Sequence, residues 1–324
     1  MNTFRVTVIL LDGFKSAFDE MIRPEFVKND FDLNEHFHKA TLGEEQIIPY
    51  LEDADAAVVG REKISRRVLE KAKNLRVISY FGTAVDSVDL HAAKARGIYV
   101  TNVPDANAIS VAELTIGLIV NCMRLVTFSH EQLRDGLWKL AIGSECEGKA
   151  LGIIGLGRIG RQVAKRAYYL GFDMKAFDIL HDPEFASTYT IEYMSLDQLL
   201  CVSDIVSIHV PLNSGTRRLI GRNQIAQMKR SSYLINTSRG EVVDEEALIE
   251  ALESNTIAGA ALDVIENEPP DRDNRLFRFD ASKTIITPHI GGGTIEATSR
   301  IAEVTRDNII LVSKGKKPRF IVNV

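Results

Sequence analysis

The chain has 324 residues, 45% of them hydrophobic and 26% charged, and its formal net charge is −5. This length exceeds the usual size of one domain, so we expect two domains. The negative charge argues against an extended nucleic-acid surface, and no apolar run approaches the ~20 residues of a membrane span. No signal-peptide pattern opens the chain, and its three cysteines are far apart in sequence, which favours a reducing, cytoplasmic environment.

Short β-type runs alternate with helical patterns along the first half, as is typical of parallel α/β sheets. We expect strands at 5–11, 56–59, 76–79 and 98–101 and helices at 44–52, 65–71 and 89–96. His36 and His38 could begin a metal site, but no companion cluster accompanies them, so we expect none.

The second half continues the alternation. Strands are expected at 151–154, 174–177, 205–208, 233–236, 258–264 and 285–287, with a helix at 244–254 that Asp244 caps. A long apolar helix at 110–126 is expected to cross from the first domain to the second. A final helix at 294–313 precedes a segment, 320–322, that is expected to return to the first domain.

The most informative stretch is G-L-G-R-I-G at 155–160, because it follows an apolar strand and opens a helix. In this position Gly155 permits a tight turn, Gly157 lets the backbone approach a pyrophosphate and Gly160 lets the helix pack closely on the strand. The backbone N–H groups of Leu156, Arg158 and Ile159 would then bind the anion. The stretch predicts a dinucleotide-binding site.

Asp178 refines that prediction, because it ends the next expected strand about 20 residues beyond Gly155. A carboxylate at this place binds ribose hydroxyls and repels a 2′-phosphate. The following residues, Ile179 and Leu180, offer no compensating charge. NAD is therefore preferred over NADP as the cofactor.

Three later strand-like runs each end beside an unusual polar residue. Arg239 follows the run at 233–236, Asp263 and Glu268 follow the next, and His289 follows the last. An arginine can hold a carboxylate with two hydrogen bonds, and a histidine oriented by an acid can exchange a hydroxyl proton. This is the minimum set for chemistry on a 2-keto or 2-hydroxy acid.

Taken in order, the motifs resemble those of the D-isomer-specific 2-hydroxyacid dehydrogenase family, and the resemblance covers most of the chain. The motifs are G-L-G-R-I-G, H-V-P-L at 209–212, N-T-S-R-G at 236–240, A-L-D-V with N-E-P at 261–269, and P-H-I-G-G at 288–292. The resemblance implies that Arg239 binds the substrate carboxylate, that Glu268 pairs with the general acid/base His289, and that Asp263 holds the nicotinamide carboxamide.

The resemblance also implies the remaining site residues. The cofactor-binding residues are expected to be Gly155, Gly157, Arg158, Ile159, Gly160, Asp178, His209, Val210, Pro211, Thr237, Asp263 and Gly291. The substrate-binding residues are expected to be Phe81, Gly82, Thr83 and Asn107. Arg61 joins them from its place at a strand end, as a candidate cation for a substrate phosphate, and not from the resemblance. The loop at 80–86 matches one whose backbone N–H groups meet the substrate carboxylate, and Phe81 replaces a smaller residue there, which is expected to narrow the pocket.

The implied fold is α/β with two doubly wound parallel sheets and an active site in the cleft between domains. Residues 1–104 plus 294–324 would form a flavodoxin-like substrate domain, and residues 105–293 a Rossmann NAD-binding domain. The nearest subgroup is phosphoglycerate dehydrogenase-like. Val59 and Tyr80, however, stand where those enzymes usually carry basic residues. A glyoxylate or hydroxypyruvate reductase, or another specialised keto-acid reductase, is therefore an alternative, and an NADH-sensing corepressor-like protein is a second. A homodimer is expected.

Overall fold

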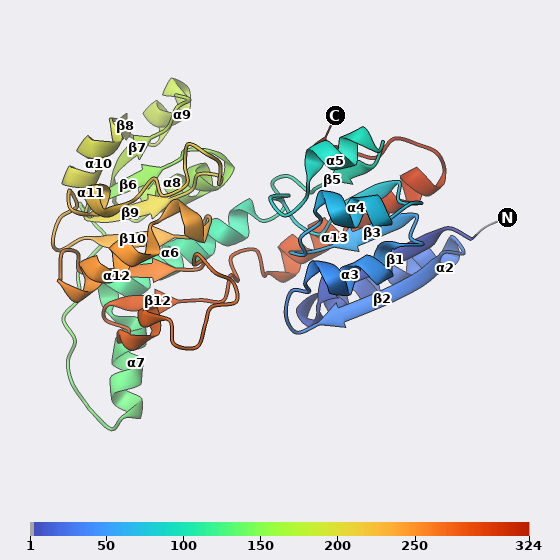
Figure 1. The fold of residues 1–324 in the computed structure, drawn as a ribbon. Helices are drawn as coiled ribbons and strands as arrows, with labels where there is room; N and C mark the ends of the chain where they lie inside the picture. The colour runs from blue at the N-terminus through green and yellow to red at the C-terminus, as the bar shows by residue number, and fades with distance from the viewer. Residues whose placement is uncertain (1–2, 324) are drawn as a thin grey trace. The chain divides into compact units, whose positions relative to one another are not determined.

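The computed structural model describes residues 3–323, and these form two compact units (Figure 1). Unit 1 comprises Met1–Asn107 and Gly293–Val324, and unit 2 comprises Ala108–Gly292. Each unit is built on its own parallel β-sheet. The predicted α/β fold with two doubly wound parallel sheets is thereby confirmed.

Unit 1 has a five-stranded sheet in the order β2-β1-β3-β4-β5, all parallel. Its elements are β1 Arg5–Leu11, α1 Lys15–Met21, α2 Arg23–Lys28, β2 Asp32–His38, α3 Glu44–Leu51, β3 Ala56–Val59, α4 Arg66–Lys71, β4 Val77–Tyr80, α5 Leu90–Ala95, β5 Tyr99–Thr101 and α13 Ile295–Ser313. Alternate strand residues pack against α3, α4 and α5 on one face and against α1, α2 and α13 on the other. The order 2-1-3-4-5 is that of flavodoxin-like folds.

The edge strand β2 of unit 1 was not expected from the sequence. Only two of its seven residues, Leu33 and Phe37, are apolar and none is fully buried, so the segment lacks the continuous apolar run of β1. Leu33 and Phe37 pack on the α13 side of the sheet. At the opposite edge Ile321 bridges Thr101, and the Val322 N–H donates to Val100 O at 2.9 Å, so the C-terminal segment returns to unit 1 as predicted.

Unit 2 has a seven-stranded sheet in the order β12-β11-β10-β9-β6-β7-β8, also all parallel. Its elements are α6 Ala108–Arg124, α7 Val126–Arg134, β6 Ala150–Ile154, α8 Arg158–Tyr169, β7 Asp173–Phe177, α9 Pro183–Thr188, β8 Ile191–Tyr193, α10 Leu196–Val202, β9 Ile205–Ile208, α11 Arg222–Ile225, β10 Tyr233–Asn236, α12 Glu245–Glu253, β11 Gly259–Leu262 and β12 Thr284–Ile286. The strand order reverses between β6 and β9, and such a switch point is where open α/β sheets bind ligands.

Helix α6 of unit 2 differs from the sequence expectation in two respects. The helix expected at 110–126 ends at Arg124, because Leu125 adopts a φ of 54° and breaks it before α7. The whole of α6 lies in unit 2, where it packs under the sheet, and does not cross between units. Among the described residues no single helix is long and apolar enough to cross a membrane. The pair α6 and α7, bent by 61°, would be so only if taken together.

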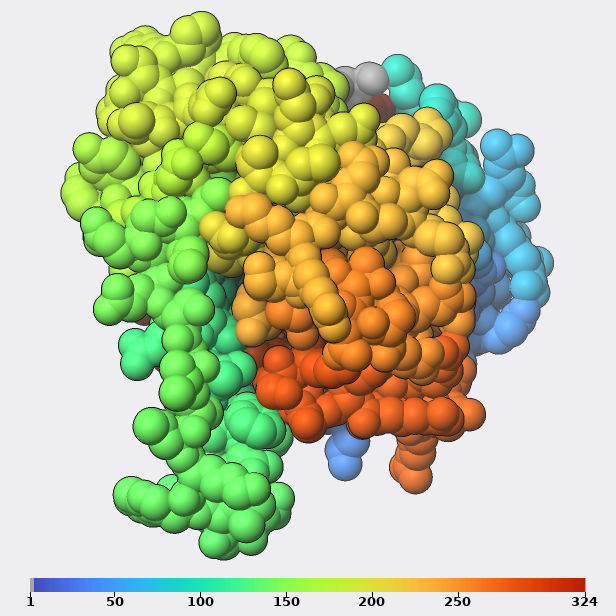
Figure 2. All heavy atoms as spheres, turned by 90° about the vertical axis from the view of Figure 1, so that its left-hand side faces the viewer, coloured from blue at the N-terminus to red at the C-terminus, as the bar shows by residue number. Residues whose placement is uncertain are grey.

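The segment from Val126 to Ser144 extends from the body of unit 2, as the green spheres of Figure 2 show. Helix α7 buries none of its residues. Beyond it Trp138 is 90% exposed, and Leu140 and Ile142 are exposed to similar extents. We call this segment, 126–144, the arm.

Candidate active site

The glycine-rich turn after β6 has the geometry that a dinucleotide site requires. Gly155 adopts a φ of 92°, and a Cβ added there would lie 2.7 Å from His209 O. A Cβ on Gly160 would lie 2.0 Å from Gly155 O, so only glycine allows α8 to start so close to β6. Gly157 caps α8 and has open space around it, which leaves the helix N-terminus accessible to an anion.

Asp178 fixes one side of this turn. Its carboxylate accepts the Leu156 N–H at 2.6 Å and the Leu180 N–H at 2.9 Å. The expectation that the Leu156 N–H binds the anion is therefore wrong, because Asp178 already occupies that donor and Leu156 is buried. The N–H groups of Arg158 and Ile159 lie in the first turn of α8, and their contact with the anion stays a prediction.

His209 lies at the carboxyl end of β9, beside the glycine turn. Its Nε2 pairs with Ser207 Oγ at 2.8 Å, whereas its Nδ1 is buried with no hydrogen-bond partner within the described residues. Burial lowers the pKa of His209 to about 3. The imidazole is therefore neutral at physiological pH and presents one unused nitrogen.

We expect His209 to make unit 2 sensitive to acid. Its folded pKa lies below the unfolded value of about 6.5, so between the two values the unfolded chain binds a proton that the folded chain does not. The free energy of unfolding therefore falls as pH drops below 6.5, by about 2 kcal/mol at pH 5 from this group alone. Denaturant unfolding of the wild type and of His209→Gln, both without cofactor, should show a shallower pH dependence in the variant. An equal pH dependence of the free energy of unfolding in both proteins would contradict a lowered pKa of His209.

The other residues predicted around the cofactor are spread along the same edge of the sheet. Thr237 is buried, and its hydroxyl pairs with Thr115 Oγ1 of α6 at 2.9 Å. Val210 is half-buried against the core of unit 2, and the Pro211 carbonyl accepts the Thr216 hydroxyl at 2.5 Å. The open N-terminus of α8, the Asp178 carboxylate and the unused His209 nitrogen fit a dinucleotide.

His289 and Glu268 form the central pair of the site. His289 Nδ1 lies 2.6 Å from Glu268 Oε2, and both side chains are partly exposed, at 29% and 28%. Because Nδ1 is engaged by the carboxylate, the ring would exchange a proton through Nε2. Glu266, the nearby alternative acid, instead pairs with Arg218 at 3.3 Å.

Asp263 holds the His289 loop in place. It is 2% exposed, and its carboxylate accepts the Thr287 hydroxyl at 2.6 Å and the N–H groups of Ile290 and Gly291, each at 2.8 Å. These bonds span His289, whose φ of 52° is a left-handed conformation that costs a side-chain-bearing residue about 1–2 kcal/mol. Asp263 therefore positions His289, and its contact with the nicotinamide stays a prediction.

Arg239 is placed by a hydrogen-bonded turn after β10. Asn236 Oδ1 accepts the Ser238 N–H at 3.0 Å, and Asn236 Nδ2 donates to Arg239 O at 2.8 Å. A Cβ added at Gly240 would lie 1.9 Å from Ile265 O, so the Arg239 loop meets the loop that leads to Glu268. Asn236 and Gly240 stand within the N-T-S-R-G motif, which predicts no role for either.

In unit 1 the loop after β4 differs from its expectation. The Phe81 ring is 5% exposed and packs edge-on against Phe14, 5.2 Å between centroids, so it belongs to the core and does not narrow a pocket. The N–H of Phe81 donates to Val59 O at 2.7 Å, and that of Gly82 to Tyr80 O at 2.9 Å. Two of the N–H groups expected to meet a substrate are thus used within the sheet edge.

The remaining substrate-side residues lie at the same edge of the unit 1 sheet or near α13. Thr83 O accepts Asn102 Nδ2, and Arg61 follows β3 as an exposed residue. Asn107 is half-buried beside Ala106, whose carbonyl accepts Nε and Nη2 of Arg300 at 2.9 and 2.7 Å. Arg300 thereby ties this turn to α13.

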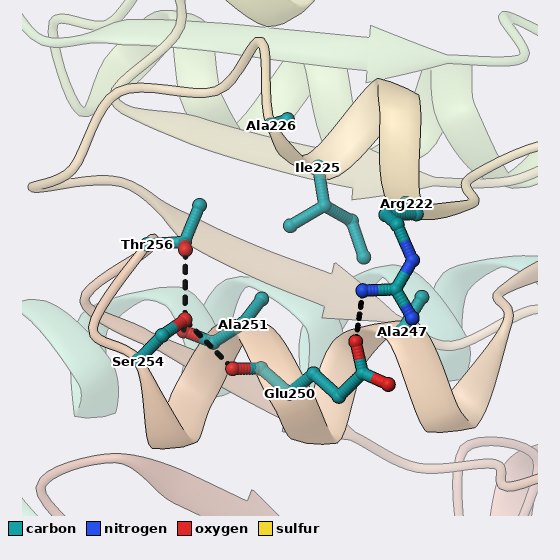
Figure 3. Close-up of a pocket in the computed structure, with 8 residues that line it drawn as sticks. All are labelled: Arg222, Ile225, Ala226, Ala247, Glu250, Ala251, Ser254 and Thr256. Carbon is teal, nitrogen blue, oxygen red and sulfur yellow. Dashed lines mark hydrogen bonds and ion pairs between the residues drawn. The ribbon is translucent and has the colours of Figure 1, made fainter.

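A hollow between α11 and α12 lies away from these residues. It measures about 290 Å³ between α11 and α12, where Arg222 pairs with Glu250 and Ser254 Oγ lies 2.9 Å from Thr256 Oγ1 (Figure 3). None of the predicted site residues lines it. Within the described part of the chain no group of three or more His, Cys, Asp or Glu side chains could hold a metal ion.

Comparison with known proteins identifies the family. Residues 116–291 match the model for the NAD binding domain of D-isomer specific 2-hydroxyacid dehydrogenases. The chain is 41% identical to a glyoxylate reductase of Thermofilum pendens over 287 residues, which are 86% of this chain and 84% of that protein. It is 42% identical to a D-3-phosphoglycerate dehydrogenase of Methanocaldococcus jannaschii over 287 residues, 87% of this chain, but spans only 54% of that relative.

A solved structure agrees over nearly the full length of both chains. The TT0316 protein of Thermus thermophilus superposes with a TM-score of 0.89 at 34% identity and covers 98% of this chain and 99% of that one. The glycine-rich turn after β6 lies in unit 2, and the His289–Glu268 pair is 2.6 Å apart. Both features agree with these matches. The chain belongs to the D-isomer specific 2-hydroxyacid dehydrogenase family, an enzyme family with an NAD-binding domain.

Proposed function

We propose that the chain interconverts a small D-2-hydroxy acid and its 2-keto acid with NAD. The observation that carries this proposal is the short contact between His289 Nδ1 and Glu268 Oε2, 2.6 Å. A histidine held by a carboxylate through one nitrogen can donate and recover a proton through the other. Reduction of a ketone to an alcohol needs such a proton at the oxygen.

Each proposed residue has one task. When bound, NADH supplies the hydride that reaches the substrate carbon. His289 Nε2 donates a proton to the keto oxygen, and Glu268 orients the ring and stabilises its charged form. Arg239 holds the substrate carboxylate through two parallel hydrogen bonds. Arg61, Thr83 and Asn107 are proposed as further substrate contacts.

The first candidate substrate is 3-phosphohydroxypyruvate, with D-3-phosphoglycerate as its reduced partner. A D-3-phosphoglycerate dehydrogenase relative at 42% identity supports it, although the chain spans about half of that relative's length. The second candidate is glyoxylate or hydroxypyruvate. It is favoured by two glyoxylate reductases that the chain matches over 84% and 91% of their lengths. Val59, fully buried in β3, also supplies no charge for a phosphate.

A substrate panel tests the proposal and separates the candidates. Oxidation of NADH would be followed with 3-phosphohydroxypyruvate, hydroxypyruvate, glyoxylate and pyruvate, and repeated with NADPH. We expect turnover with at least one acid and a preference for NADH, because Asp178 repels a 2′-phosphate. Tight NADH binding without turnover of any acid would support an NADH-sensing protein instead. A preference for NADPH would contradict the role of Asp178.

We also propose that two copies of the chain pair through the arm. Trp138, Leu140 and Ile142 are 84–90% exposed, a density of apolar surface that monomers seldom present to water. An open hollow of about 340 Å³ between α6 and α8, lined in part by Ile116, Tyr169 and Leu170, offers apolar surface for a partner.

The free cysteines Cys122, Cys146 and Cys201 support a reducing, cytoplasmic location.

Light scattering with size separation checks the pairing. The wild type is expected at twice the 36.0 kDa chain mass and a Trp138→Asp, Leu140→Asp double variant at the chain mass. The two added carboxylates would each be desolvated in an apolar interface. Val27→Asp, at a 59% exposed position of α2, is the matched control and should behave as the wild type. A monomeric wild type would refute the pairing.

A further inference from the structure

A buried carboxylate lies beneath the segment that carries Arg61, and the proposed reaction does not use it. Glu62 follows β3 and is 1% exposed. Its neighbours Arg61 and Lys63 are exposed, and Ile64 is fully buried. The segment thus alternates as a strand does, with Arg61 and Lys63 outward and Glu62 and Ile64 inward.

The carboxylate of Glu62 is bonded to the backbone of its own turn. Glu62 Oε2 accepts the Gly60 N–H at 2.9 Å. The same N–H lies 3.3 Å from Ile9 O, a longer contact. The backbone pairing of β3 with β1 is therefore weaker at Gly60, where the Glu62 carboxylate accepts the N–H. Burial raises the pKa of Glu62, and the backbone N–H groups of Glu62 and Gly60, with the charges of His38 and Arg61, oppose that rise.

The turn is fixed at both ends by other contacts. Val59 closes β3, and its carbonyl accepts the Phe81 N–H at 2.7 Å. On the far side the Ile64 N–H donates to Ser87 O at 2.8 Å, and Ile64 O accepts the Asp89 N–H at 2.9 Å. Between these anchors the Glu62 carboxylate bridges back to Gly60 and sets the path of the chain through Arg61.

A carboxylate is a costly group to bury, since an apolar side chain of similar size would fill the space without a desolvation penalty. We propose that Glu62 is a positioning residue for the substrate. By accepting a hydrogen bond from the Gly60 N–H on the buried side of the turn, it fixes the backbone that carries Arg61. This inference rests on the proposed function of Arg61 as a substrate contact. It adds a residue to the site that touches neither substrate nor cofactor.

The test compares three variants in steady-state reduction of whichever acid in the panel is turned over. Glu62→Ala removes the hydrogen-bond acceptor, whereas Glu62→Gln keeps one and removes only the charge. Glu62→Ala should raise KM for the keto acid about tenfold, with kcat and KM for NADH little changed. Glu62→Gln should restore KM to within about threefold of the wild type. Glu70→Ala, at an exposed position of α4, is the control.

A double-mutant cycle shows whether Glu62 acts through Arg61. In an Arg61→Ala background, Glu62→Ala should add little further to KM, because the two changes remove the same interaction. Full additivity, or equal damage from Glu62→Gln and Glu62→Ala, would overturn the proposal. A general packing defect would instead lower thermal stability and impair both Glu62 variants alike.

Amide hydrogen exchange separates this inference from the proposed reaction. In the protein without cofactor, residues 60–64 should exchange faster in Glu62→Ala than in the wild type and at the wild-type rate in Glu62→Gln. If no acid in the panel is turned over, the proposed function fails, and exchange still decides whether Glu62 holds the turn. Unchanged exchange in Glu62→Ala would overturn the inference even if the reaction were established.

Discussion

Replacing His289 by asparagine is expected to lower kcat for keto-acid reduction by about 10²–10⁴-fold, the usual contribution of a general acid. The reason lies in the pair that His289 Nδ1 makes with Glu268 Oε2 at 2.6 Å, which leaves Nε2 as the proton donor. Asparagine can fill the place and keep a hydrogen bond to Glu268, but it cannot give up a proton at neutral pH. Binding of NADH should change little, because the dinucleotide turn lies on other residues.

Two further variants make this result specific. Glu268→Gln keeps the shape of the pair but removes the charge that stabilises protonated His289, so a smaller loss of kcat is expected. His91→Asn changes an exposed histidine of α5 and should leave kcat unaltered. Stopped-flow measurement of hydride transfer, with NADH affinity measured by fluorescence, checks all three. Full activity of His289→Asn would remove the proton-transfer role from this residue.

The fold could be predicted where local pattern and burial agree. Strands β1, β3, β9 and β10 have the bounds expected from their apolar runs, because each is covered on both faces. The edge strand β2 was not predicted because its burial is incomplete and its sequence, DLNEHFH, has neither a continuous apolar run nor a regular apolar–polar alternation. The break at Leu125 gave no signal, since neither glycine nor proline stands there and its φ of 54° is uncommon for leucine.

At the site, residue types could be predicted from the motifs but hydrogen-bond partners could not. Glycine spacing placed the turn, yet nothing in the sequence shows that Asp178 takes the Leu156 N–H. The position of Asp263 after a strand does not show that its carboxylate will accept the N–H groups of Ile290 and Gly291, which follow His289. Phe81 resembled a pocket residue because its neighbours did, and its ring lies in the core instead. Hydrogen-bond partners of this kind lie on loops that follow different strands, and these loops come into contact only when the sheet has formed.

Gly240→Ala is expected to have a large effect on both stability and activity, because Gly240 lies where the Arg239 loop contacts the loop that leads to Glu268. A Cβ at Gly240 would lie 1.9 Å from Ile265 O and 2.5 Å from Glu266 N, both rigid backbone atoms. Relief requires the loop that carries Arg239 to separate from the loop that leads to Glu268. We expect a loss of about 3 kcal/mol in the free energy of unfolding. The kcat/KM should fall by about 10²-fold, because a displacement near 1 Å is enough to misplace Arg239.

Gly117→Ala is the matched control, because a Cβ at this position of α6 meets open space. Alanine in a helix should leave stability unchanged or raise it by up to about 1 kcal/mol. Thermal unfolding and steady-state kinetics of both variants separate a backbone clash from a general effect of the added methyl group. The Asn236–Arg239 turn and the Asp263–His289 loop lie on different strands, so their alignment depends on the contact at Gly240. A stable and fully active Gly240→Ala would show that the reactive groups tolerate separation of the two loops, and the role assigned to that contact would be wrong.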